Sequence, residues 1–383
     1  MLDIDIVGGT DTVSVLIKLV GEVCNLDCAY CYERRKPYAG NRLVEPHEVR
    51  ALLDTLSDRP VRVELHGGEP LLYPKTKMAE VVALLATAPQ VVGVSMQTNG
   101  TRLDRDWLRI FRPIQHKMEI GISIDGPGQS NSWRFDHAGR PAFKQIVDGI
   151  TMLADENLNT GLIAVVTNKS IGQERAILEF VAGFPNVSVL KFVPCFDFGV
   201  TQGVGPKRSA KTTKAAASGP ALGAAWSISP PAYLDFLTTA FDIWTRDGHS
   251  VAFVLEPFLA LTRALLALPT DNCTYSSVKC AHVVTLYPGG QVGSCDELDR
   301  KDAAIGGLAD YVSPNAGFAG CKTSEDARAL LQKCGECAYW DRCQGGCIAT
   351  RKRFRKVDRE DDYCAYRMGL IDFMSGKMPE AAQ

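Results

Sequence analysis

The feature that most constrains the fold of this chain is a regular alternation of short β-rich runs with helical patterns in its first half. Each run has the length and the β-branched content of a strand, and enough residues for a helix separate it from the next. Such alternation predicts a parallel sheet with helices outside it. The predicted strands are Ser14–Val20, Val61–His66, Val91–Gln97, Glu119–Ile124, Gly161–Thr167 and Val187–Pro194.

Six strand–helix units predict an α/β fold built on a partial (β/α)6 barrel, in which the chemistry sits at the C-terminal ends of the strands. Residues 200–229 are rich in Ala, Gly, Ser and Lys and have no apolar period, so they read as a flexible insertion or linker. Helical patterns follow at Tyr233–Trp244 and Phe258–Leu268. We therefore expect a barrel at 1–199, a linker at 200–229, bridging helices at 230–270 and a small cysteine-rich domain at 271–383.

Composition excludes several classes of function. The formal net charge is only -2 and no long Lys/Arg run occurs, so neither nucleic acid nor a membrane surface is an expected partner. The first twenty residues lack a basic segment followed by an apolar one, and no apolar run of membrane-spanning length follows. We therefore expect a cytoplasmic protein. In that compartment the 13 cysteines favour metal or redox chemistry over disulfides.

Three cysteines, Cys24, Cys28 and Cys31, follow the first predicted strand directly. Three thiolates can hold three irons of a 4Fe-4S cluster and leave the fourth iron open. The amino and carboxylate groups of S-adenosylmethionine (SAM) could chelate that iron, and an electron from the cluster would then yield a 5′-deoxyadenosyl radical. The alternative is a structural zinc knuckle, which requires a fourth ligand close by. No further Cys or His lies near this loop in the sequence, so the iron–sulfur interpretation is preferred.

Around this loop the first half of the chain resembles the radical SAM superfamily, because segments at successive strand ends match that family. His66-Gly67-Gly68-Glu69-Pro70 is similar to its GGEP segment, whose backbone and carboxylate meet the methionine amino group. Taken singly, Gly-Gly and Asn-Gly are ordinary turn residues and Arg134 could be a solvated surface side chain. Together they imply a SAM pocket whose cofactor-binding residues are Tyr30, Tyr32, Gly67, Gly68, Glu69, Asn99, Ser123, Asp125, Arg134 and Phe196.

The C-terminal third contains a seven-cysteine array that resembles the SPASM domain, whose members carry two auxiliary iron–sulfur clusters and mostly modify ribosomally made peptides. Cys273 could supply an eighth ligand, although some relatives leave one auxiliary iron open for substrate. Two zinc ribbons are the alternative, since Cys-x2-Cys is also a zinc spacing. The resemblance implies one cluster on Cys273, Cys280, Cys295 and Cys347, and another on Cys334, Cys337, Cys343 and Cys364.

Asp296 follows Cys295 directly. The chain is similar to anaerobic sulfatase-maturating enzymes, in which an aspartate after the matching cysteine removes a proton from the substrate. The resemblance implies that Asp296 is a catalytic general base. A surface or hydrogen-bonded aspartate without a catalytic role is the alternative.

The resemblance as a whole implies an enzyme that abstracts a hydrogen atom from a ribosomally made peptide and installs an oxidative intramolecular crosslink of the cyclophane or thioether type. Its cofactors would be three 4Fe-4S clusters and SAM, and its partners a precursor peptide and a low-potential electron donor, flavodoxin or ferredoxin. A sulfatase-maturating enzyme that forms formylglycine from Cys or Ser is the first alternative. It is ranked second because two segments are more similar to those of peptide maturases, namely Cys31-Tyr32-Glu33 and His66-Gly67-Gly68-Glu69-Pro70-Leu71. A non-catalytic electron carrier or zinc scaffold is an alternative of another class.

Overall fold

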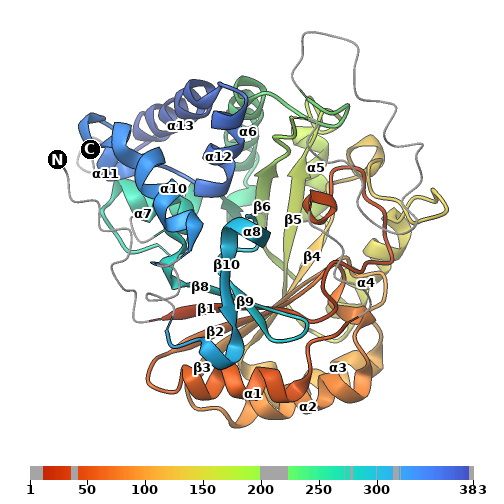
Figure 1. The fold of residues 1–383 in the computed structure, drawn as a ribbon. Coiled ribbons are helices and arrows are strands. Elements are labelled where there is room, and N and C mark those ends of the chain that lie inside the picture. Colours follow the sequence, from red (N-terminus) through yellow and green to blue (C-terminus); the bar gives the residue numbers. More distant parts are fainter. Residues whose placement is uncertain are drawn as a thin grey trace.

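One ten-stranded sheet forms the frame of the molecule (Figure 1). The structure, a computed structural model, describes residues 12–35, 42–198, 223–270, 272–276, 279–298, 300–313, 319 and 321–378. Strands β1 to β6 lie side by side in chain order and are parallel, and a helix follows each, as the alternation in the sequence predicts. The strands are β1 (Val13–Lys18), β2 (Val61–His66), β3 (Val91–Thr98), β4 (Met118–Ser123), β5 (Thr160–Val166), β6 (Val187–Pro194), β7 (Val254–Glu256), β8 (Val283–Tyr287), β9 (Gln291–Gly293) and β10 (Ala304–Gly307).

The helices begin and pack as their sequences suggest. Helix α1 starts at a proline, and Glu45 and Glu48 form a reciprocal capping box at its first turn. Helix α4 buries Ile146, Ile150 and Leu153, which recur at helical spacing on one face. The helices are α1 (Pro46–Thr55), α2 (Lys75–Thr87), α3 (Arg105–Phe111), α4 (Phe143–Asp155), α5 (Glu174–Ala182), α6 (Pro230–Arg246), α7 (Phe258–Leu265), α8 (Arg300–Ala303), α10 (Lys322–Leu331), α11 (Trp340–Cys343), α12 (Ile348–Lys356) and α13 (Glu360–Ser375); short 3-10 turns are η1 (Tyr32–Arg35), η2 (Pro70–Leu72), η3 (Arg112–Lys117), η4 (Gly128–Asn131), η6 (His249–Val251), η7 (Cys273–Tyr275), η8 (Lys279–His282), η9 (Leu308–Asp310) and η10 (Gln332–Glu336).

Both edges of the six-stranded core are extended by strands that the sequence patterns did not predict. Strand β7 pairs with β6 in parallel, and β8 pairs with β1 in parallel. Strands β9 and β10 then continue the sheet in antiparallel fashion. The expected bridging and C-terminal regions thus contribute to the same sheet as the barrel, and the division of the chain into domains stays a proposal based on sequence.

The C-terminal helices lie at one end of the molecule beside α6, away from α1 to α3 at the opposite end (Figure 1). Helix α13 packs on α6 and α7. Phe196, just after β6, makes edge-on ring contacts with Phe354 of α12 and Tyr366 of α13. These contacts join the barrel and the C-terminal region through one hydrophobic core.

Part of the expected linker at 200–229 is packed rather than flexible. Residues 200–222 lie outside the described residues. In the described remainder, Trp226 and Ile228 are buried, and the backbone N–H of Ile228 donates to the carbonyl of Cys195 over 3.1 Å. Apolar side chains that alternate over only five residues are too few to give a pattern against the small residues before them. In the part of the chain that the structure describes, no helix combines the length and the apolar character needed to cross a membrane.

Candidate active site

A cavity of about 440 Å³ opens where several strand ends meet the C-terminal region. Its wall comes from the cysteine loop after β1, from the segments after β2, β3, β4 and β6, and from the loop after β9. The structure therefore brings together residues that are far apart in the sequence. Of the predicted site residues, the cavity is lined by Cys24, Cys28, Cys31, Tyr30, Tyr32, Gly67, Gly68, Asn99, Ser123, Arg134, Phe196 and Asp296.

The three cysteines of the first loop lie on this wall, and the loop is held by its neighbours. The N–H of Leu26 donates to Cys24 Sγ over 3.4 Å, and the amide of Asn99 approaches the same sulfur at 3.7 Å. Burial, then Glu69, and then Cys28 raise the pKa of the Cys24 thiol well above its usual value. Buried thiols that resist ionisation alone need a cation such as iron to hold them as thiolates. This donor set fits a cluster bound on three sulfurs beside a cavity.

The Gly67-Gly68 segment approaches the cysteine loop too closely for any other residue. A Cβ on Gly68 would lie 2.2 Å from the carbonyl oxygen of Val23. The Gly68 N–H donates to the carbonyl of Gly21 over 2.7 Å, and the Glu69 N–H donates to that of Val23 over 2.9 Å. The two loops are thus joined backbone to backbone, which explains the paired glycines.

Glu69 lies behind the cavity wall rather than on it. Its carboxylate is fully buried and accepts hydrogen bonds from the Thr98 hydroxyl at 2.6 Å, the Asn99 N–H at 2.8 Å and the Leu71 N–H at 2.9 Å. Burial raises its pKa in spite of these bonds. Glu69 therefore ties the segments after β2 and β3 together, and the contact predicted between its carboxylate and a methionine amino group stays a prediction.

Asp125 also lies behind the wall and positions two residues on it. Its Oδ1 accepts from Arg134 Nη2 at 2.9 Å, and its Oδ2 accepts from the Tyr30 hydroxyl. Burial opposes the charge of Arg134, yet Asp125 and Tyr30 raise the pKa of the guanidinium. Within the described residues Arg134 Nε is buried without a hydrogen-bond partner, although the side chain lines the cavity. A buried donor of this kind needs an acceptor, and the carboxylate of SAM would supply one.

Ser123 and Phe196 both line the cavity. Ser123 Oγ accepts from Gln97 Nε2 over 2.8 Å, which holds the ends of β3 and β4 together. Phe196 is buried but contributes to the lining, as expected of a residue near an adenine ring. Both positions fit the predicted SAM pocket.

Asp296 lies in the cavity beside a buried lysine that sequence reasoning missed. Lys18, the last residue of β1, donates to Asp296 Oδ2 over 3.0 Å and to Glu33 Oε1 over 2.6 Å. Its Nζ also lies 3.1 Å from Nδ1 of His66, its partner in the register of β1 and β2. The Tyr32 hydroxyl donates to Asp296 Oδ2 over 2.9 Å. The predicted cofactor contact at Tyr32 is thus joined by an observed contact with the predicted base.

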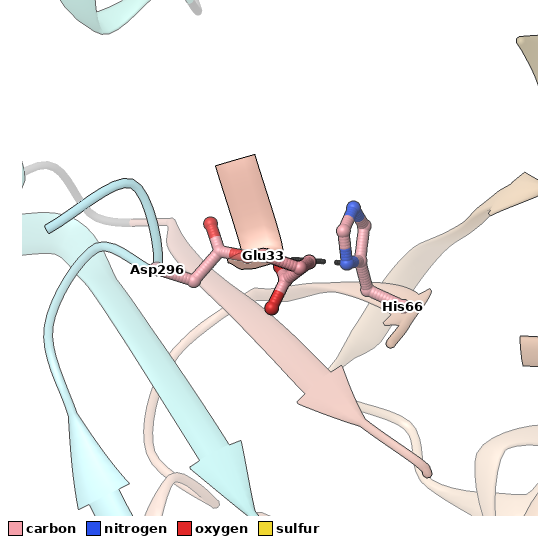
Figure 2. A group of neighbouring side chains, drawn as sticks. All are labelled: Glu33, His66 and Asp296. Atoms are coloured by element: carbon pink, nitrogen blue, oxygen red, sulfur yellow. Dashed lines mark ion pairs between the residues drawn. The ribbon is translucent and has the colours of Figure 1, made fainter. Parts of the chain in front are cut away.

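Figure 2 shows the Glu33 and Asp296 carboxyl groups and the His66 imidazole converging from three segments of the chain. Their ligand atoms lie close enough to surround a metal ion. The ammonium of Lys18 lies within 3.1 Å of all three groups, so the chain's own cation occupies the centre of this cluster. Burial opposes its charge, but Glu33 and Asp296 raise its pKa. Burial and then Lys18 lower the pKa of His66, which favours the neutral imidazole.

The cysteines predicted to hold one auxiliary cluster also lie together; we call Cys273, Cys280, Cys295 and Cys347 the first cysteine set. A hydrogen bond links Cys295 to Cys280, and it is the largest of the influences that raise the pKa of Cys295. Burial, then Cys347 and Cys295, raise the pKa of Cys273 to about 12. Cys295 and Cys347 thus lie near enough to Cys273 to influence its thiol, and the role of Cys273 as a cluster ligand stays a prediction.

The cysteines predicted for the other auxiliary cluster line a second, small cavity; we call Cys334, Cys337, Cys343 and Cys364 the second cysteine set. Four thiols of this kind could hold either a 4Fe-4S cluster or a tetrahedral zinc ion. The assignment of iron–sulfur clusters to the two sets therefore stays a prediction.

Comparison with known proteins agrees with this geometry. Residues 19–181 match the model of the Radical SAM superfamily. A serine-type anaerobic sulfatase-maturating enzyme of Bacteroides thetaiotaomicron is 25% identical over 362 residues, covering 88% of this chain and 83% of the relative. A cysteine-type anaerobic sulfatase-maturating enzyme of Clostridium novyi is 24% identical over 371 residues, covering 92% of each chain. A solved structure of native anSMEcpe with bound AdoMet superposes with a TM-score of 0.77 at 20% identity, covering 96% of this chain and 99% of that one. The predicted fold class and family resemblance are confirmed.

Proposed function

Because residues 19–181 of this chain form a radical SAM domain, we propose that the protein is a peptide-modifying oxidoreductase of that kind. It removes a hydrogen atom, a proton and one electron from a residue of its substrate. The loss amounts to a two-electron oxidation.

The hydrogen atom is lost in the large cavity. A 4Fe-4S cluster and SAM, when bound there, supply a 5′-deoxyadenosyl radical that abstracts it. Cys24, Cys28 and Cys31 would hold the cluster, and the Arg134 guanidinium would receive the carboxylate of SAM. Asp125 and Glu69 keep this wall in place through the hydrogen bonds described above.

The position of Asp296 is the observation that carries the proposal. Its carboxylate lies in the same cavity as the three cysteines of the first loop, and Cys295 of the first cysteine set precedes it directly. A carboxylate between a site of hydrogen abstraction and a site for an electron can accept the proton that the substrate must lose. Lys18 and Tyr32 hold Oδ2 by hydrogen bonds, so Asp296 is oriented before substrate arrives.

Each of the two cysteine sets would hold an auxiliary 4Fe-4S cluster, and such a cluster would supply an acceptor for the electron. The chain would then carry three clusters, two of them without a vacant iron. A low-potential electron donor, flavodoxin or ferredoxin, would supply the electron that SAM cleavage consumes. Anaerobic reconstitution should give about twelve irons per chain. Zinc, or about eight irons, would contradict this content.

We propose an intramolecular crosslink of the cyclophane or thioether type in a ribosomally made peptide as the product. Support comes from the residues around Asp296. The chain departs from the Cys-Phe and Gln-Gly-Gly-Glu-Pro-Thr forms of sulfatase maturation at Tyr32 and His66. Tyr32 contacts Asp296 directly, and His66 Nδ1 lies 3.9 Å from its Oδ2. We therefore expect the surroundings of Asp296 to differ from those of the corresponding base in sulfatase-maturating enzymes, close to where the oxidised residue would lie.

Formylglycine formation in a sulfatase is the second candidate. Similarity to serine-type and cysteine-type sulfatase-maturating enzymes along 88% and 92% of this chain supports it. The identities of 25% and 24% are low enough for a change of substrate within a shared fold.

The two candidates are separated by carbonyl chemistry. Crosslinking and formylglycine formation from Ser both remove two hydrogens, so the intact mass of the product does not distinguish them. The enzyme would be incubated anaerobically with SAM, dithionite and a candidate precursor peptide chosen from the genes beside its own. We expect a product that does not react with a hydrazide probe and resists fragmentation between the joined residues. A hydrazone adduct would favour sulfatase maturation instead.

A further inference from the structure

Two buried arginines lie against the second cysteine set, and the proposed reaction does not use them. Arg351 of α12 and Arg367 of α13 are 1% and 4% exposed. Burying a guanidinium is costly unless it is paired and hydrogen-bonded. What each arginine contacts therefore indicates why it is there.

Arg351 donates a hydrogen bond to a predicted cluster ligand. Its Nη1 lies 3.0 Å from Cys334 Sγ and 3.3 Å from the carbonyl of Gly345. On its other side, Nε donates to Glu360 Oε1 over 3.0 Å. Glu360 balances much of the charge of Arg351. Arg351 would therefore act on a cluster at the second cysteine set mainly through its hydrogen bond to Cys334 Sγ.

Arg367 lies beside a second ligand of the same set. Its guanidinium stacks over the ring of Tyr275 at 4.1 Å, and Nη2 donates to the carbonyls of Thr274 and Cys343 at 3.0 and 2.9 Å. The hydrogen bond to the Cys343 carbonyl keeps the charge of Arg367 beside this ligand. Among the described residues Arg367 Nε is buried without a hydrogen-bond partner. A sulfide of a cluster would satisfy this donor.

We propose that Arg351 and Arg367 raise the reduction potential of the cluster on the second cysteine set, an inference that rests on the proposed function. A reduced cluster carries one more negative charge than an oxidised one. Hydrogen-bond donors and cations at its sulfurs therefore stabilise the reduced form, and they do so strongly in a buried site.

The experiment is a reductive titration followed by electron paramagnetic resonance. Every sample carries Cys24→Ala, Cys28→Ala and Cys31→Ala in the full chain, so that only the auxiliary clusters give a signal. Arg351→Met should move the midpoint of one of the two signals to lower potential and leave the other in place. Arg351→Lys should move it less. Arg355→Met is the matched control, because Arg355 lies one turn further along α12, is exposed and contacts only the carbonyl of Ala329 in the described residues.

A second variant tests the same idea with the opposite sign. Glu360→Gln leaves Arg351 in place but removes the carboxylate that balances it, so the same midpoint should move to higher potential. This variant also decides the matter if Arg351→Met does not load its cluster. Midpoints that stay in place in Glu360→Gln, or in a loaded Arg351→Met, would overturn the inference. Fewer than about eight irons in the background that carries only the three first-loop Cys→Ala changes would instead overturn the proposed cluster content.

Discussion

Replacing Lys18 by Met tests whether the buried ammonium holds the predicted base in place. Lys18 is fully buried, and the side chains of Glu33 and Asp296 are only 3% and 7% exposed. Met keeps the length and packing of the lysine stem but leaves two buried carboxylates without their cation. Removing one partner of a buried ion pair costs about 3–5 kcal/mol.

This loss of folding free energy corresponds to a decrease in melting temperature. Unfolding entropy is about 2.1 cal/mol/K per residue, and the chain has 383 residues. If the chain unfolds as one unit, about 3–5 kcal/mol lowers the melting temperature by about 4–6 °C. Circular dichroism of the anaerobically reconstituted protein measures the change. In the same variant, 5′-deoxyadenosine should still form, but peptide product should fall because Asp296 has lost its hydrogen bond from Lys18.

The control is the double variant Lys18→Met/Glu33→Gln. It leaves a single carboxylate, which Tyr32 still holds, so it should melt higher than Lys18→Met alone. An unchanged melting temperature in Lys18→Met, or a further loss on adding Glu33→Gln, would show that the three groups are not coupled. Normal yields of peptide product in Lys18→Met would show that the lysine does not position the base.

Three further predictions concern the base, the first loop and the glycine contact. Asp296→Asn should keep all clusters and still yield 5′-deoxyadenosine, while peptide product falls roughly a hundredfold to ten-thousandfold. Both yields are measured in one anaerobic assay. Normal product formation would show that Asp296 has only a structural role. The combined Cys24→Ala, Cys28→Ala and Cys31→Ala variant should lose SAM cleavage and keep about eight of twelve irons, and 5′-deoxyadenosine from the dithionite-reduced variant would contradict the assignment. Gly68→Ala should reduce SAM cleavage because its Cβ would lie 2.2 Å from the Val23 carbonyl oxygen. Gly161→Ala should not reduce it, because its Cβ would meet Val189 at an ordinary 3.9 Å. Equal activity of the two variants would argue against the close approach of the loops.

The parts of the fold that the sequence predicted are those with a local pattern. The six parallel strands appear within a few residues of their predicted bounds, because β-branched runs and the gaps between them are visible along the chain. Strand β7 has only three residues and β9 only three, which is too short for a period. Their pairing depends on which edges of the sheet remain open, and that is decided by the whole fold.

The same distinction applies to the site. The cysteines and glycines were found because their spacing is itself a signal. Lys18, Glu33 and His66 have no such spacing, and only their convergence in space gives them a role. One signal was present, because Lys18 lies inside the otherwise apolar run 15–20. A side chain in a buried parallel strand does not reach solvent. A charge there requires partners from elsewhere in the chain.

The pairing of β1 with β8 has a consequence for how the protein folds and survives. Val15 pairs with Val284, 269 positions later in the chain, so β1 emerges during synthesis long before the strand that covers its edge. Until then the apolar strand VSVLIK offers a row of unpaired amide and carbonyl groups to any other extended chain. Such distant pairing also slows folding. A chain cut at residue 270 would keep that exposure permanently and should aggregate, and the C-terminal region thus protects the barrel from association with its own copies.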